Sequence, residues 1–149
     1  MIQTTRRELD VPLETRSLAP LREFVRDALS GSGLGTQTSR AMVIAIDEAC
    51  SSIILNAKAN GASGNLHLSI DVDRTRVKVH VADTGNDYDM GDLTREELLH
   101  EFTRSKKNEL GTFLIRRIVD EFTYVFKKGF QSELTMIKFL FERDEAEKN

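Results

Sequence analysis

The sequence contains little that would point to a disulfide-rich, membrane-spanning or nucleic-acid-binding protein. Cys50 is the only cysteine among 149 residues, which excludes an intramolecular disulfide or a cysteine cluster for a metal and favours a cytoplasmic protein. No apolar run reaches the roughly 18 residues that a helix needs to cross a bilayer. Met1–Asp10 is polar and lacks the apolar segment of a secretory signal. The net charge of −3 gives the chain no overall attraction to nucleic acid or to an anionic membrane.

What the chain does contain fits a single folded domain over residues 1–149. Hydrophobic residues make up 40% and charged residues 30%, which is enough for a core and a well-solvated surface. Its two prolines, Pro12 and Pro20, both lie near the start, so most of the chain is free of proline breaks. We expect a folded core over about residues 7–141 and a charged tail over 142–149.

The spacing of apolar residues predicts the secondary structure. Alternating apolar residues predict strands, and apolar residues three and four apart predict helices. The first half of the chain is predicted to hold a strand at 7–11, a helix capped by Ser17, a glycine-rich linker at 31–35 and a helix opened by Ser39. A hairpin follows, with strands at 66–72 and 77–81 and its turn at 73–75. The remainder is predicted to hold a polar segment at 84–108 with a short helix at 95–102, a helix from Leu110, and strands at 122–127 and 133–141 joined by a turn at Gly129.

This order of elements predicts the fold class. Strands come in hairpins and helices connect the hairpins, which favours an α+β fold, a two-layer α/β sandwich. We expect a mixed, mostly antiparallel sheet with its helices on one face. The long polar segment at 84–108 is typical of a lid over a functional site or of a mobile loop.

The second helix carries the first group of candidate functional residues. Glu48, Ser52 and Asn56 are four residues apart, so they project along one side of the helix. A carboxylate with a hydroxyl and an amide on the following turns can hold a hydrated divalent cation or orient a nucleophile. A solvent-facing polar stripe has the same spacing, and the spacing alone favours that interpretation.

A second candidate is the exit of the valine-rich strand. Asp83 ends this strand and Gly85 follows, so the carboxylate can accept a hydrogen bond from a ligand's amine where a backbone comes close. An ordinary Asp-Gly turn explains the same residues. Asp87 and Asp89 add acidic groups, but the remainder of an EF-hand calcium loop is missing.

A third candidate is the start of the third helix, at Leu110, Gly111 and Thr112. A glycine there lets backbone N–H groups reach a phosphate, and the helix dipole favours the anion. Lys106 and Lys107 lie just upstream. Many helices begin near a glycine, so this segment alone does not decide between a phosphate site and a plain helix start.

The histidines and the cysteine offer little for catalysis. His67, His80 and His100 are scattered, and the two in the hairpin fall opposite its leucine and valine rows, which favours surface positions over metal ligation. Cys50 falls on the apolar face of its helix and is predicted to be an inert core thiol.

Taken together, four segments resemble the motifs of the GHKL (Bergerat-fold, HATPase_c) ATPases over about residues 7–141. Within that family the chain is most similar to the RsbW/SpoIIAB-type anti-sigma factor serine kinases, to judge from Asp120-Glu121 and the closing strand. The matching segments are residues 44–52 for the N box, 81–89 for the first glycine box, 110–121 for the second, and 134–140 for the closing strand.

The resemblance implies a fold, an activity and partners. Members hold ATP between the helical layer and a lid, bind a sigma factor, and use ATP with Mg²⁺ to phosphorylate a serine or threonine of an anti-anti-sigma protein. They often form homodimers and act on proteins rather than on nucleic acid or membranes. Glu48 matches the proposed general base, and Asp83 matches the aspartate that bonds the adenine amine. The cofactor-binding residues that the resemblance implies are Asp83, Gly85, Leu110, Gly111, Thr112 and Thr135.

Three positions depart from the family pattern. Ser52 replaces the asparagine that ligates Mg²⁺, so metal binding at Ser52 would run through a water or be lost. Glu109 replaces a glycine and would set a carboxylate against the triphosphate. Gln131 replaces the glycine before the last strand, with Gly129 displaced by two positions.

These departures leave alternative functions open. One is an active serine/threonine protein kinase that regulates transcription by partner switching. A second is a degenerate member that binds its partners without phosphotransfer. A third is an α+β interaction domain without a nucleotide site.

Overall fold

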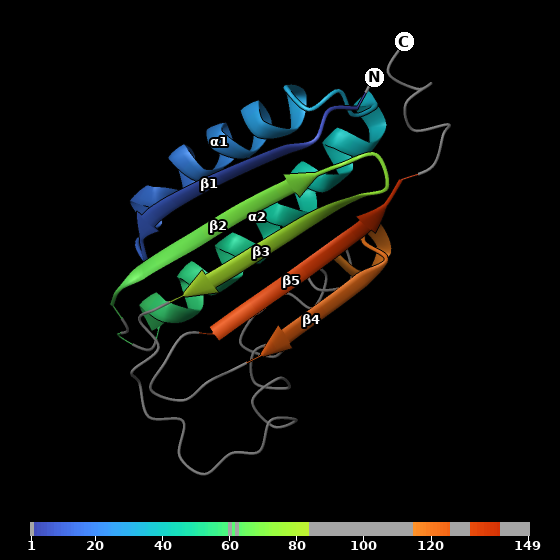
Figure 1. The fold of residues 1–149 in the computed structure, drawn as a ribbon. Helices are drawn as coiled ribbons and strands as arrows, with labels where there is room; N and C mark the ends of the chain where they lie inside the picture. The colour runs from blue at the N-terminus through green and yellow to red at the C-terminus, as the bar shows by residue number, and fades with distance from the viewer. Residues whose placement is uncertain (1, 60, 62, 84–114, 126–131, 141–149) are drawn as a thin grey trace.

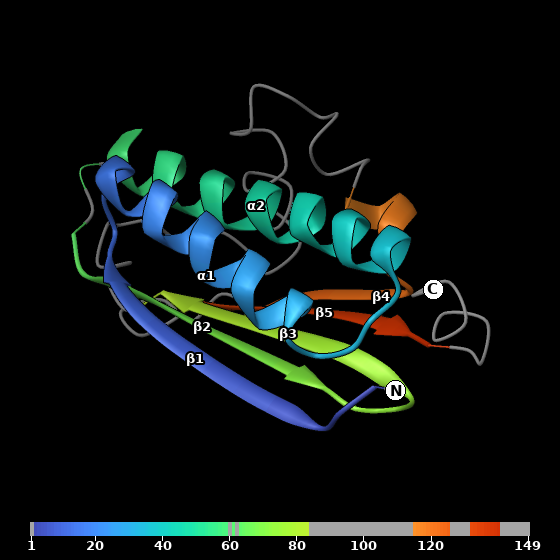
Figure 2. The ribbon, with the colours of Figure 1, turned by 90° about the horizontal axis from the view of Figure 1, so that it is seen from above.

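The computed structural model describes residues 2–59, 61, 63–83, 115–125 and 132–140. In this part of the chain, two long helices cover one face of a β-sheet (Figures 1 and 2). Residues 115–118 add a short helical segment. The elements are β1 (Thr5–Pro12), a 3₁₀ turn (Thr15–Ser17), α1 (Leu18–Ser30), α2 (Thr36–Ala59), β2 (Asn65–Val72), β3 (Arg76–Asp83), β4 (Glu121–Val125) and β5 (Ser132–Phe139).

Within the described residues, the sheet has five strands in the order β1-β2-β3-β5-β4, and every neighbouring pair is antiparallel. Strand β5, which follows β4 along the chain, therefore lies between β3 and β4 (Figure 1). This arrangement confirms the predicted two-layer sandwich with helices on one face of the sheet.

The core forms where the alternating strands meet the apolar faces of the helices. In the centre of the sheet, Val79 lies opposite Met136 and Val81 opposite Leu134, and all four side chains are buried. Leu68, the partner of Val81 on β2, is buried as well. Each such side chain contributes roughly 1.5–3 kcal/mol by leaving water. From α2, Met42 and other apolar residues pack onto this row.

The hairpin turn between β2 and β3 confirms the turn predicted at 73–75. The Asp73 carboxylate accepts hydrogen bonds from the Thr75 N–H at 2.7 Å, the Thr75 hydroxyl at 2.7 Å and the Arg76 N–H at 3.0 Å. These bonds, above all those from Thr75, hold the pKa of Asp73 below its ordinary value.

Two helix starts differ from the prediction. The side chain of Ser17 does not cap α1: Ser17 continues a 3₁₀ turn in a helical conformation, and its hydroxyl donates to the Pro12 carbonyl at 2.8 Å. The second helix begins at Thr36 rather than at Ser39, because the Ser39 N–H already donates to the Gly35 carbonyl at 2.9 Å. Ser39 thus lies in the first turn of α2.

The linker between α1 and α2, residues 31–35, is confirmed and is held by hydrogen bonds. The Ser32 hydroxyl donates to the Leu29 carbonyl at 2.6 Å, and the Ser32 carbonyl accepts from the Gln3 N–H at 2.9 Å. Gly33 has a φ of 85°, a conformation that residues with a side chain rarely adopt. The two helices are therefore joined by a well-defined connection.

Several predictions fall outside the described residues. They concern the polar segment at 84–108, the helix start at Leu110, the turn at Gly129 and the tail at 142–149. Within the described ranges, no helix combines the length and the apolarity that a membrane span requires.

Candidate functional site

The middle of α2 carries two of the predicted site residues. Glu48 is half-buried, and Ser52, one turn later, is only 6% exposed. The Ser52 hydroxyl oxygen is buried and has no hydrogen-bond partner among the described residues. Leaving such a hydroxyl unpaired costs roughly 1–3 kcal/mol, so this oxygen is a candidate contact for a bound water or ligand.

Asp83 lies in the sheet, on the face that α2 covers. Because side chains alternate along a strand, Asp83 continues the buried row of Val77, Val79 and Val81. Its register partners are Leu66 on β2 and Ser132 on β5. Asp83 is 7% exposed, which places a carboxylate at the end of an otherwise apolar row.

The fold sets these groups in facing layers. The C-terminal end of β3 lies beneath the C-terminal half of α2 in both views (Figures 1 and 2). Glu48 and Ser52 belong to that half of the helix, and Asp83 ends the strand. The sheet therefore supplies a hydrogen-bond acceptor, Asp83, and the helix above it supplies the carboxylate of Glu48 and the hydroxyl of Ser52.

Thr135 does not join this group. The register pairs it with His80, on the face of the sheet opposite the buried row that ends in Asp83. Instead, the register sets Ser132 opposite Asp83. Ser132 was not among the predicted site residues. The alternation along β5 could have indicated it, because Leu134 and Met136 are buried and residues two apart share one face of a strand.

Other predicted site residues lie outside the described part of the chain. They are Gly85, Leu110, Gly111 and Thr112, together with the departures Glu109 and Gln131. Their predicted roles stay predictions.

Next to Glu48, Asp47 has a structural partner that the sequence did not reveal. Arg22 on α1 donates from Nε to the Asp47 carboxylate at 2.6 Å, and this bond raises the pKa of Arg22. The pair joins α1 to α2. Of the two adjacent carboxylates, Asp47 thus serves the contact between the helices.

The two described histidines lie on the sheet face opposite the buried leucine and valine rows, and Cys50 is buried, as predicted. On the outer face of the sheet, His67 lies 2.8 Å from the Asp10 carboxylate and 3.2 Å from that of Glu8. No group of three or more histidine, cysteine or acidic residues in the described ranges could hold a metal. Cys50 is buried, and burial raises the pKa of its thiol to about 12, which keeps it protonated and inert.

Comparison with known proteins identifies the family. The family model described as "Histidine kinase-like ATPase domain" matches residues 11–138, which is most of the chain. The protein therefore belongs to the histidine kinase-like ATPases, the GHKL family that the motifs resemble.

The chain is also similar to curated relatives named serine-protein kinase RsbW. The relative from Bacillus thuringiensis (strain Al Hakam) is 24% identical over 144 residues, covering 94% of this chain and 88% of the relative. The relative from Halalkalibacterium halodurans is 29% identical over 145 residues, covering 94% of this chain and 86% of the relative. This similarity extends over nearly the whole chain.

Proposed function

We propose that this protein is an anti-sigma factor-type regulator that binds ATP and phosphorylates a serine or threonine of an anti-anti-sigma partner while sequestering a sigma factor. The family match over residues 11–138 carries the proposal. The relatives named serine-protein kinase RsbW support the kinase activity. In this function, the protein acts in the cytoplasm through contacts with other proteins rather than with nucleic acid or membranes, and it assembles as a homodimer.

In this proposal, Asp83 selects the base. A buried carboxylate at the end of an apolar strand row accepts a hydrogen bond from the exocyclic amine of adenine, while the apolar surroundings contact the ring. Guanine carries a carbonyl at the corresponding position, so Asp83 disfavours it. Gly85 belongs to the same proposal, because a residue without a side chain lets the base approach the backbone.

On the helix, Glu48 accepts the proton of the partner's hydroxyl as that oxygen attacks. A carboxylate suits this role when it lies within hydrogen-bond reach of the nucleophile. ATP with Mg²⁺ supplies the phosphoryl group and the charge neutralisation when bound. Gly111, with Leu110 and Thr112, offers backbone N–H groups to the phosphates in this proposal.

The Mg²⁺ position fits the described residues if the ion keeps water in its shell. A hydroxyl is a shorter and weaker ligand than an amide oxygen, but the buried Ser52 oxygen can hold a metal-bound water. Glu48, one turn away, supplies the nearby negative charge. Thr135 was also predicted to bind the cofactor. Because it lies on the opposite face of the sheet, substitution of Thr135 is needed to test that role.

A second candidate function is a family member that binds its partners without phosphotransfer. The replacement of the metal-binding asparagine by Ser52 favours it, because phosphoryl transfer depends on the metal for neutralising charge.

Calorimetric titration with ATP, with and without Mg²⁺, tests both functions. The kinase proposal expects Mg²⁺ to strengthen binding, and Glu48→Ala to abolish phosphate transfer to the partner while ATP still binds. Binding of ATP that is indifferent to Mg²⁺, with no transfer by the unmodified protein, would select the second function. No binding at millimolar ATP would overturn the nucleotide site.

A further inference from the structure

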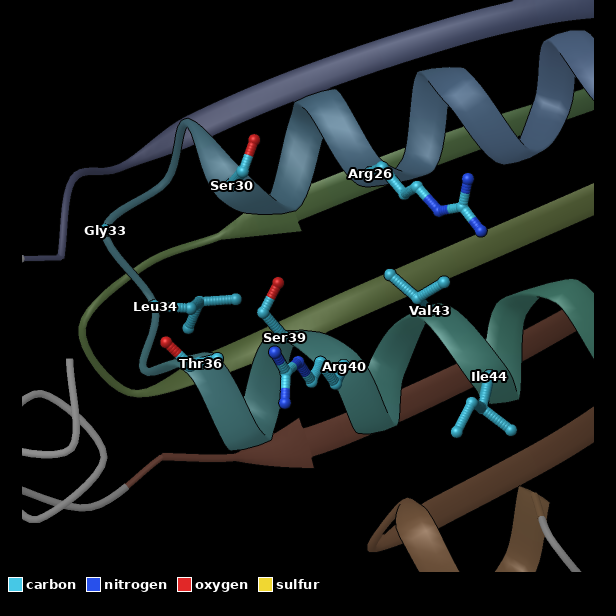
Figure 3. A pocket seen from close by; sticks show the side chains of 9 residues that line it. All are labelled: Arg26, Ser30, Gly33, Leu34, Thr36, Ser39, Arg40, Val43 and Ile44. Atoms are coloured by element: carbon cyan, nitrogen blue, oxygen red, sulfur yellow. The ribbon is translucent and has the colours of Figure 1, made fainter.

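A groove lies between the C-terminal end of α1 and the N-terminal start of α2, with a volume of about 650 Å³ (Figure 3). It is at the opposite end of α2 from the end of β3 that carries Asp83 (Figure 2), so it is separate from the candidate site. The residues that matter for its chemistry are Arg26, Leu34, Thr36, Arg40, Val43 and Ile44.

The inner surface of the groove is apolar. Leu34 is buried at its closed end, Val43 is half-buried and points into the gap between the helices, and Ile44 is 48% exposed on α2 (Figure 3). Ile44 is one of the few large hydrophobic side chains of the described residues that remain exposed. Covering these side chains would remove apolar surface from water and favour a bound partner.

The rims of the groove are positively charged. Arg26 extends from α1 toward the gap, and Arg40 lies on α2 (Figure 3). Neither arginine has an ion pair or a side-chain hydrogen bond within the described part of the chain, whereas Arg22, one turn before Arg26, binds Asp47. No lining residue is acidic. The first turn of the 24-residue helix α2, which starts at Thr36, adds the positive end of its dipole.

We propose that this groove binds a segment of a partner protein, namely an amphipathic helix whose apolar face carries leucine-like side chains and whose flanks carry carboxylates. The apolar inner surface takes the leucine-like side chains, and the two arginines pair with the carboxylates. A helical segment fits better than a small molecule, because the groove runs between two helices and its charges stand at the rims. The linker, fixed through Ser32 and Gly33, keeps the groove formed in the free protein.

A synthetic peptide tests this proposal on the full chain. The probe is a fluorescein-labelled helix of about 14 residues with leucines at positions i, i+4, i+7 and i+11 and glutamates beside them. One control peptide has lysine in place of each glutamate, and the other has glutamine in place of each leucine. Fluorescence anisotropy at low and at high salt gives the affinities. We expect the acidic peptide alone to bind, and more weakly at high salt.

Substitutions of exposed residues then locate the binding surface. Arg26→Gln combined with Arg40→Gln should raise the Kd of the acidic peptide about tenfold or more, since both charge pairs are lost. Lys58→Gln removes one positive charge near the other end of α2 and should leave the Kd unchanged. Ile44→Asn should weaken binding, while Leu55→Asn, also at an exposed position of α2, should not. Circular dichroism verifies that each variant is folded.

Four results would overturn the proposal. The first is equal binding of the acidic and lysine peptides, and the second is an unchanged Kd in the double arginine variant. The third is light scattering that shows a dimer broken by that variant, which would make a second copy the occupant. The fourth is a gain in peptide affinity on removing residues 142–149, which would make the chain's own acidic end the occupant. ATP titration of the same variants should be unaffected, which keeps this test distinct from that of the proposed function.

Discussion

Ser52 lies one helical turn after Glu48 on α2, and its hydroxyl oxygen is buried without a hydrogen-bond partner in the described part of the protein. Buried hydroxyl groups on a helix that packs against a sheet usually have a hydrogen-bond partner, and alanine is a common residue where none is available. In the proposed function, Ser52 is therefore the position that most directly distinguishes an active kinase from a family member without phosphotransfer.

Exchange of this serine tests the metal site directly. Ser52→Asn supplies the amide oxygen that the family uses, so the affinity for ATP should rise about tenfold in the presence of Mg²⁺ and change little without it. Isothermal titration calorimetry measures both values. Ser51→Asn, at the half-buried neighbouring position, is the matched control and should show no Mg²⁺-dependent gain. An equal gain with and without Mg²⁺ would argue against a metal at this position.

A second prediction concerns base selection by Asp83. Asp83→Ala should weaken ATP binding by roughly 1.5–3 kcal/mol, the usual contribution of a hydrogen bond to a charged group. Inorganic tripolyphosphate, which has no base, should bind the variant and the unmodified protein equally well in a competition assay. Asp10→Asn, at the exposed outer face of the sheet, serves as the control. If tripolyphosphate also lost affinity, Asp83 would have a general structural role instead.

The contact between Arg22 and Asp47 should contribute a measurable but small coupling energy. Their side chains are 45% and 30% exposed, and water screens such a pair. A double-mutant cycle with Arg22→Ala and Asp47→Ala, followed by urea unfolding, should give a coupling of about 0.5 kcal/mol that shrinks at high salt. A coupling that does not respond to salt would show that packing, rather than charge, joins the two helices there.

The stability of the protein should fall at alkaline pH because of Cys50. Its thiol has a pKa of about 12 in the folded protein, against an ordinary value of 9.0. The unfolded chain therefore loses this proton first, and the free energy of unfolding should decrease by about 1.4 kcal/mol per pH unit between these two values. Below pH 9 the contribution is complete.

Denaturant unfolding at several pH values checks this expectation. Cys50→Ala removes the thiol and should reduce the alkaline loss of stability, although other groups titrate in the same range. A native Cys50 should also react slowly with a thiol reagent at pH 8, because burial keeps the thiol protonated and covered. Rapid modification of the folded protein would contradict the burial of this residue.

Much of this fold could be predicted from the sequence because alternation and helical spacing are local signals. The valine row of β3 and the leucine row of β2 predicted a hairpin, and the turn at Asp73 follows from the side chain of that residue. The helix starts were less accurate. The Ser17 hydroxyl bonds the Pro12 carbonyl, a contact outside the helix that its spacing does not reveal. The α2 helix starts about a turn before Ser39, because the Ser39 N–H already makes a helical bond to the Gly35 carbonyl.

The candidate site was predicted in part. Glu48 and Asp83 came from motifs that combine local spacing with order along the chain, and the fold sets their elements in facing layers. The register of β5 could not be read from residue types alone, since a shift by one residue exchanges the two faces of a strand. Thr135 therefore lies opposite His80 while Ser132 lies opposite Asp83. The Arg22–Asp47 pair joins two helices, and no local sequence pattern predicts a contact between residues so far apart in the chain.

The position of β5 has a consequence for folding of the chain during its synthesis on the ribosome. Because β5 inserts between β3 and β4, these three strands cannot assemble in the order in which the chain is synthesised. Until residues 132–140 leave the exit tunnel, β3 presents an open edge whose backbone groups can pair with another nascent chain. Premature termination before Ser132 should therefore yield an aggregating fragment rather than a smaller working domain.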